Sequence, residues 1–194
     1  MKSSKTRLLT HRPHLIGTAI FLTIALAMPT GSTFADQHRL SDRHKMEIDN
    51  SIKEHLGEKT ANEVMSFFHN AEMAIQSRDI EALMALYSDG YRDGDHDKAA
   101  ARKTWERIFK RFSELVTRHN MSLVTKSSDE DLVIMRCSGI LLGIPEGSEG
   151  SIAIDNWNQQ DHVLKKEDGQ WKLIGTFGKE RKRLWFDKPM HPLF

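Results

Sequence analysis

The chain has 194 residues, of which 39% are hydrophobic and 28% charged, and its formal net charge is +1. This balance excludes the basic surface on which nucleic-acid-binding proteins depend, so no nucleic acid is predicted as a partner. The single cysteine, Cys137, excludes an intrachain disulfide; it lies in an apolar run, and we expect a buried, unreactive thiol.

The first 35 residues have the order of a secretory signal peptide. Four basic residues and no acidic one precede an apolar run from Leu15 to Met28, and Thr33 and Ala35 provide the small residues of a cleavage site. The apolar run is shorter than the roughly 20 residues that a membrane-spanning helix needs. We therefore expect cleavage after Ala35, no stable membrane anchor thereafter, and a periplasmic or secreted location in a bacterium. An N-terminal anchor that is never cleaved is the alternative.

Removing residues 1–35 leaves 159 residues, enough for one domain with its own core. It also removes four positive charges from a total of +1, which leaves about −3. Residues 36–59 form a polar N-terminal extension. Ile48, Ile52 and Leu56 recur at every fourth position there, which predicts a short helix that Gly57 ends.

Two helices are predicted next. Thr60 and Glu63 have the spacing of a capping box, and apolar residues then recur at helical spacing as far as Ile75. Asp79 is predicted as the N-cap of the following helix, which residues 88–90 end.

A polar loop, residues 91–97, precedes a third helix. Asp97 is its predicted N-cap, and an apolar stripe extends from Lys98 to about Thr117. The stripes of the first and third helices are predicted to meet in one core, formed by Phe67, Phe68, Trp105, Ile108 and Phe112.

The second half of the chain favours strands. They are expected at residues 121–125, 132–142, 151–166 and 171–177, with Glu167-Asp168-Gly169 as a hairpin turn. A basic and then aromatic tail covers residues 179–194. Helices followed by an antiparallel meander indicate an α+β fold.

Two segments resemble one family. Residues 77–91, SRDIEALMALYSDGY, resemble the helix pair that opens NTF2-like domains of the SnoaL-like and ketosteroid-isomerase-like kind. Residues 161–175, DHVLKKEDGQWKLIG, resemble the hairpin that closes them. The resemblance covers about residues 60–178 and implies an α+β cone, with three N-terminal helices packed in a curved antiparallel sheet. The family holds isomerases, cyclases, dehydratases, transport factors and proteins without known activity, so the fold does not fix the function.

The sequence offers no metal site. Asp93, Asp95 and Asp97 match positions one, three and five of an EF-hand loop, but Lys98 and Thr104 occupy its glycine and bidentate-glutamate positions. The histidines are scattered, and no phosphate-binding loop or nucleophile motif occurs. We expect neither a metal nor a cofactor.

Proton transfer by acidic and aromatic residues is one open reading. The resemblance can place Tyr91, Asp93 and His96 near the mouth of the cone, although a solvated loop is the simpler interpretation. An isomerase of this family needs an Asp base and two oxyanion donors, for which Tyr87 or Tyr91 and Asp155 or Asp161 are candidates without a residue-by-residue match. The catalytic candidates are therefore Tyr91, Asp93, His96 and Asp161.

A strict period of two puts Trp157 and Asp161 on one face of the strand 151–166. That face has the mixed character of a pocket lining, or it belongs to a solvated edge strand. Arg136 either points to solvent or pairs with Asp155 or Asp161. The predicted ligand-binding residues are Tyr87, Arg136, Trp157 and Asp161.

Three functions stay open at this stage. The first is binding of a small, largely apolar molecule in the cone, without established catalysis. The second is an acid/base enzyme of the same fold, of the isomerase, dehydratase or cyclase type. The third is a periplasmic protein-interaction domain, with a homodimer among its forms.

Overall fold

The computed structural model describes residues 40–129 and 131–177, which belong to one compact unit. The predicted signal peptide, residues 1–35, and the tail, residues 179–194, lie outside the described residues. Within the described part, no helix is both long enough and apolar enough to cross a membrane.

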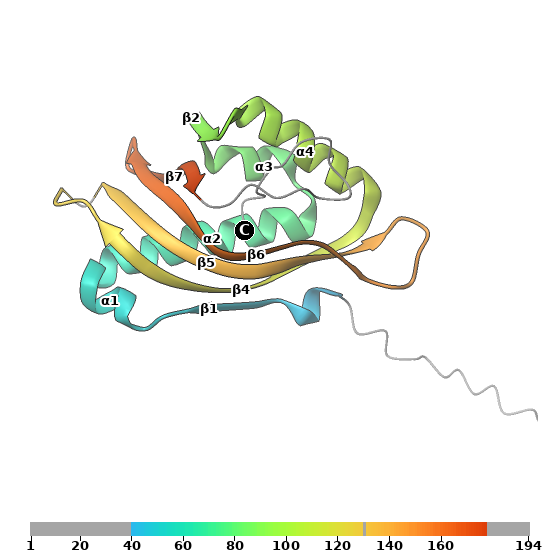
Figure 1. The fold of residues 1–194 in the computed structure, drawn as a ribbon, viewed down its shortest axis with the longest axis horizontal. Helices are drawn as coiled ribbons and strands as arrows, with labels where there is room; N and C mark the ends of the chain where they lie inside the picture. Colours follow the sequence, from blue (N-terminus) through green and yellow to red (C-terminus); the bar gives the residue numbers. More distant parts are fainter. Residues whose placement is uncertain (1–39, 130, 178–194) are drawn as a thin grey trace, which may run out of the picture. The chain divides into compact units, whose positions relative to one another are not determined.

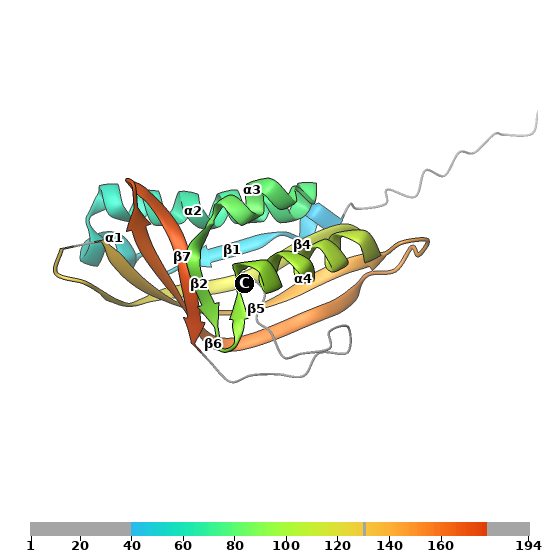
Figure 2. The same ribbon diagram turned by 90° about the horizontal axis from the view of Figure 1, so that it is seen from above.

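A curved seven-stranded sheet holds the helices on its concave side, in the α+β arrangement that the sequence predicts (Figure 1). The strand order is β1-β4-β5-β6-β7-β2-β3. The four strands from β4 to β7 form the predicted antiparallel meander, whereas β1 pairs with β4 and β2 pairs with β7 in parallel. Figure 2 shows β2 beside β7, with the short β3 next to it. The strands are β1 (Lys45–Ile48), β2 (Tyr87–Asp93), β3 (His96–Asp97), β4 (Phe112–Lys126), β5 (Leu132–Pro145), β6 (Ile152–Glu167) and β7 (Gln170–Phe177).

The N-terminal segment is part of this unit. A 3-10 helix, η1 (Leu40–Arg43), leads into β1, and α1 (Ser51–Leu56) follows and ends at Gly57. Ile52 and Leu56 are buried in the common core. The segment therefore supplies one strand and one helix to the fold.

The long helix α2 (Glu58–Ser77) runs along the concave side of the sheet (Figure 1). It begins three residues earlier than the capping box predicts, because Gly57 is its N-cap and no side chain caps it. The predicted capping box is wrong, since the Glu63 carboxylate accepts instead from Lys166 Nζ at 2.7 Å and Trp171 Nε1 at 3.1 Å. Contacts with the β6–β7 hairpin thus outweigh the local cap.

The two aspartate caps are confirmed. Asp79 accepts from the Ala82 amide at 2.9 Å and starts α3 (Ile80–Ala85). Asp97 accepts from the Ala100 amide at 2.9 Å and starts α4 (Lys98–Arg111).

Two boundaries differ from the sequence prediction. Residues 87–97 form the strands β2 and β3 rather than a helix end and a loop. The third predicted helix ends at Arg111 rather than near Thr117, because Phe112 already begins β4 and pairs with Pro145 of β5. Strand pairing across the chain overrides the helical spacing here.

The predicted core is confirmed. Each of its five members is at most 3% exposed, and all belong to one apolar cluster between the helices and the concave face: Phe67, Phe68, Trp105, Ile108 and Phe112.

Candidate functional site

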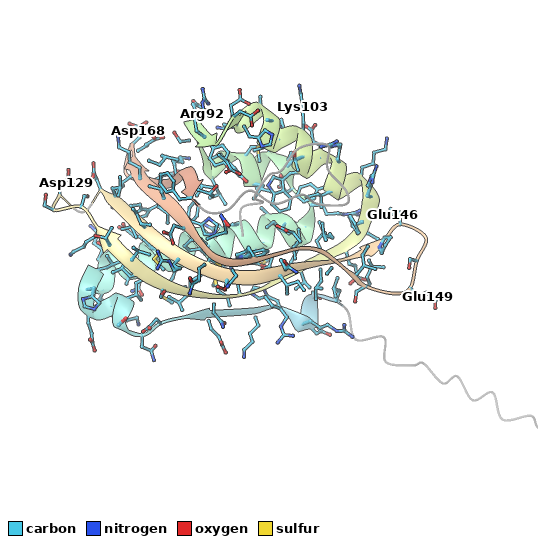
Figure 3. The ribbon with its side chains drawn as sticks, in the orientation of Figure 1. Arg92, Lys103, Asp129, Glu146, Glu149 and Asp168 are labelled. Carbon is cyan, nitrogen blue, oxygen red and sulfur yellow. The ribbon has the colours of Figure 1, made fainter. Side chains whose placement is uncertain are left out.

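A buried carboxylate lies between α2 and β4. Glu72 is 1% exposed, and its Oε1 lies 3.4 Å from His119 Nε2 and accepts a hydrogen bond from the Thr117 hydroxyl. Figure 3 shows side chains filling the space between the helices and the sheet, whereas the labelled charged residues, such as Arg92 and Lys103, lie on the outside. A charge in such an interior needs several donors to offset the lost hydration.

The N-terminal segment provides a third donor. His44 Nδ1 lies 3.0 Å from Glu72 Oε2 and 3.1 Å from the Thr117 carbonyl oxygen. The hydrogen bond to Glu72 raises the pKa of His44 above its usual 6.5, although partial burial acts in the opposite direction. The charged form of His44 is thus favoured beside Glu72.

Burial and hydrogen bonding compete at Glu72. Burial alone raises the pKa of its carboxyl, but the hydrogen bonds from His119, His44 and Thr117 outweigh burial and bring the pKa to about 2. Glu72 is therefore ionised throughout the physiological range.

A thiol and an indole continue the cluster on the sheet. Cys137 Sγ on β5 lies 3.7 Å from His119 Nδ1 and accepts from Trp157 Nε1 of β6 at 3.1 Å. Cys137 is buried, as predicted, and burial raises the pKa of its thiol to about 12. The thiol therefore keeps its hydrogen at neutral pH.

His162 of β6 is also fully buried. Its ring centroid lies 6.2 Å from that of Phe68 on α2. Burial, together with the neighbouring His119, lowers the pKa of His162 to about 3, so its imidazole is neutral. We call Glu72, Thr117, His119, Cys137, Trp157 and His162 the polar cluster.

A β-bulge in β6 brings Trp157 and His162 to the same side. Trp157 pairs with Gly139 and Gln160 with Cys137, so β6 has one residue more than β5 between these pairs. Gln159 adopts a left-handed backbone with φ of 53° at this point. The bulge turns Asp161 to the opposite face, and the prediction that Trp157 and Asp161 share a face is therefore wrong.

Asp161 and Arg136 form an ion pair on that opposite face. Asp161 accepts from Arg136 Nε at 2.7 Å and from Nη2 at 2.9 Å, and the two residues are direct neighbours across β5 and β6. The Arg136 side chain is 44% exposed, so it points to solvent as the simpler reading predicts. This pair lies apart from the polar cluster.

The two predicted tyrosines lie in the core at β2. Their ring centroids are 4.7 Å apart, and Tyr87 Oη accepts from Trp105 Nε1 at 3.0 Å. Burial raises the pKa of Tyr87. Tyr87 and Tyr91 are thus buried side by side near α4.

Asp93 and His96 pair across the β2–β3 hairpin. His96 is nearly buried, and its Nε2 lies 3.8 Å from Asp95 Oδ1. Asp93 lines a pocket of about 420 Å³ together with Val163 and Phe177 of the neighbouring strands. The predicted site residues therefore occupy separate places, and their roles remain predictions.

No family model and no curated protein matches the chain by sequence. Solved structures do resemble it. A candidate scytalone dehydratase from Novosphingobium aromaticivorans DSM 12444 aligns with a TM-score of 0.57 at 15% identity, over 71% of this chain and 95% of that one. A candidate aromatic ring hydroxylase from Novosphingobium aromaticivorans aligns with a TM-score of 0.51 at 13% identity, over 59% and 83%. A hexachlorocyclohexane dehydrochlorinase, LinA type 2, aligns with a TM-score of 0.50 at 16% identity, over 70% and 95%.

The fold is NTF2-like. This confirms the resemblance seen in the sequence, and the neighbours of this NTF2-like domain include enzymes. At such low identity the likeness concerns the fold, and the chemistry has to be argued from the polar cluster.

The sequence reasoning missed most of the polar cluster of this NTF2-like domain. A signal for Glu72 was present, because it follows Phe68 by four residues and precedes Ile75 by three, within the apolar stripe of the helix. Alternation from Leu115 likewise puts His119 on the buried face of β4. His162 had no such signal, since the bulge resets the alternation in β6.

Proposed function

We propose that this NTF2-like protein binds a small, largely apolar molecule on the concave side of its sheet, with the polar cluster as the polar end of the site. One observation carries the proposal: among the described residues, the polar side chains of the polar cluster converge within a largely apolar interior. Ligand sites have this composition, because apolar walls supply affinity and a few fixed polar groups supply orientation.

The surroundings of the polar cluster fit an apolar ligand. Phe68, Met135 and Leu164 are fully buried in the same interior. His162 is neutral there, and the charge of Glu72 is held by its three donors. A ligand with a large charge would have no free counter-charge among these groups, whereas a neutral molecule with one polar atom would match them.

Native mass spectrometry of the protein purified from the periplasm tests this function. We expect a retained small molecule in the wild type, and a loss of that mass in His119→Phe. The matched control is Asp161→Asn on the opposite face, which keeps the ligand. An intact wild-type protein without any bound mass, and without saturable binding of the neutral apolar dye Nile red, would contradict the proposal.

Proton transfer is a second candidate function, and the His119–Glu72 pair favours it. A histidine oriented by a buried carboxylate is a common acid/base unit, since the carboxylate stabilises the imidazolium that forms. The test incubates the retained molecule with the protein in D₂O and follows deuterium uptake or a change of mass. Catalysis predicts a change that His119→Gln abolishes, while an unchanged molecule leaves binding alone as the function.

We also propose that the protein is exported. The order of charged, apolar and small residues in the first 35 positions supports this. N-terminal sequencing of the extracytoplasmic protein should begin at Asp36, and an intact Met1 there contradicts cleavage. The same native mass spectra give the number of subunits and so test for a homodimer.

A further inference from the structure

The hydrogen positions in the polar cluster follow from two independent constraints. The first comes from Trp157, whose indole N–H can only donate. Its Nε1 lies 3.1 Å from Cys137 Sγ, so the sulfur is the acceptor in this contact. The thiol, with its pKa raised to about 12, retains its own hydrogen, which is then available to His119 Nδ1 at 3.7 Å.

The second constraint comes from Glu72. Its carboxyl, with a pKa of about 2, is ionised and can only accept. His119 Nε2 lies 3.4 Å from Glu72 Oε1, so the carboxylate stabilises a hydrogen on Nε2 and would repel a lone pair there. In a neutral imidazole this leaves Nδ1 as the acceptor, which is what the thiol on the other side requires.

We propose that Cys137 is a positioning residue, which holds the neutral form of the His119 imidazole in the tautomer with hydrogen on Nε2. Each residue then donates a hydrogen to the next, in the order Trp157, Cys137, His119 and Glu72. This deepens the proton-transfer function and, as a catalytic role, rests on it. The hydrogen positions themselves do not depend on any ligand.

These hydrogen positions determine which ring nitrogen of His119 can accept a further proton. Nε2 already carries a hydrogen, so a proton that His119 accepts has to bind at Nδ1, beside the thiol. A donor to Nδ1 stabilises the neutral ring with hydrogen on Nε2, so the Cys137 thiol favours this tautomer over the one with hydrogen on Nδ1. The titratable groups that face His119 from the neighbouring elements are Glu72, His44 and His162.

Long-range ¹H–¹⁵N NMR of the ligand-free protein tests the proposal through the two ring nitrogens of His119. In the wild type, the neutral ring of His119 should carry its hydrogen on Nε2. Cys137→Ser retains a donor and should keep that tautomer. Cys137→Ala removes the donor, so the fraction of the neutral ring with hydrogen on Nδ1 should rise.

Ser138→Ala is the control, because Ser138 is the next residue of β5 and bonds Asn158 on the opposite side. It should leave the tautomer ratio of His119 unchanged. Hydrogen on Nδ1 alone in the neutral ring of the wild type or of Cys137→Ser overturns the proposal, as does a Cys137→Ala variant with the wild-type tautomer ratio. If Cys137→Ala does not fold, the wild type and Cys137→Ser still decide. If native mass spectrometry finds no bound molecule, the proposed function is contradicted, but the conclusion about the His119 tautomer is unaffected.

Discussion

Glu72 and His162 share one interior and respond to burial in opposite ways. Burial disfavours the charged form of each, which raises the pKa of a carboxyl and lowers that of an imidazole. His162 follows this rule and is neutral, with a pKa of about 3. Glu72 is the exception and stays ionised, because His119, His44 and Thr117 stabilise its charge.

His162 should make the fold sensitive to mild acid. Its pKa is about 3 in the folded state against a usual 6.5, so its stabilising contribution is complete above pH 6.5 and is lost as the pH falls toward 3. In that window the free energy of unfolding should fall by about 1.4 kcal/mol per pH unit from this residue. We expect His162→Gln to lack this component when urea unfolding is measured between pH 7.5 and pH 5.

Glu72 does not interfere with that measurement. Its pKa is lowered from 4.5 to about 2, so its contribution is present above pH 4.5 and is lost only below it. The difference between the wild type and His162→Gln therefore isolates His162. Parallel stability curves for the two proteins over this range would mean that His162 is not a buried neutral base.

At the scale of elements, the bulge in β6 decides which side chains reach the interior. A regular strand would place Asp161 with Trp157; one extra residue at Gln159 places His162 there instead. Bulges are frequent next to functional sites because they redirect a side chain without moving the rest of the strand.

Gln159 should tolerate glycine and reject valine. Its φ of 53° is unfavourable for a side chain with a Cβ, and most unfavourable for a β-branched one. We expect Gln159→Gly to change the free energy of unfolding by about 0–1 kcal/mol in the stabilising direction, and Gln159→Val to destabilise by roughly 1–2 kcal/mol. Equal stability of both variants in urea denaturation would show that the left-handed turn is absent.

Gly139 should be sterically indispensable to the same region. A Cβ there would lie 2.6 Å from the Arg118 carbonyl oxygen and 2.7 Å from Trp157 Cζ2. We expect Gly139→Ala to destabilise by about 1–3 kcal/mol through overpacking. Gly90→Ala is the control, because a Cβ at Gly90 would have Ser88 Oγ as its nearest neighbour, at 3.6 Å. Its change in the free energy of unfolding should be near zero in the same thermal or urea assay.

The sequence predicts elements whose cause is local and misses those whose cause is distant. Asp79 and Asp97 cap their helices through their own side chains, so both helix starts were predictable. The end of α4 at Arg111 depends on the pairing of Phe112 with Pro145, which no local window contains. Glu63 likewise bonds a hairpin about 100 residues further along the chain instead of capping its helix.

The candidate site follows the same division. Burial of Cys137 was predictable from its apolar neighbours, and the Arg136–Asp161 pair was among the alternatives that the sequence left open. Neither residue pattern nor spacing indicates that Cys137 meets His119, because that contact depends on the register of β4 and β5. The inward position of His162 depends on the bulge.

For the molecule as a whole, the N-terminal segment is a structural part of the domain. Ile52 of α1 is 1% exposed and packs in the core shared with α2 and the sheet. β1 adds to the sheet at the edge of β4. Residues 45–56 therefore contribute to stability as well as extending the chain.

Ile52→Ala tests this contribution. We expect it to lower the free energy of unfolding by about 2–5 kcal/mol, because it removes buried methyl groups and leaves a cavity. Lys53→Ala, at the next and exposed position, should stay within about 0.5 kcal/mol of the wild type. Similar small effects for both would show that α1 is not packed on the domain.

The parallel pairing of β1 with β4 also sets the order in which the molecule opens. β1 has only four residues and lies at the edge of the sheet. It pairs Lys45 with Arg118, which is distant in the sequence. Forming this pairing therefore costs much chain entropy and gains few hydrogen bonds. Its amide hydrogens should exchange with solvent deuterium through a local opening, well ahead of those of β4 and β5. Because His44 directly precedes β1, each such opening would withdraw one donor from Glu72 while the antiparallel strands stay closed. Amide exchange at Met46 and Ile48 should therefore report how often the buried carboxylate loses its His44 donor.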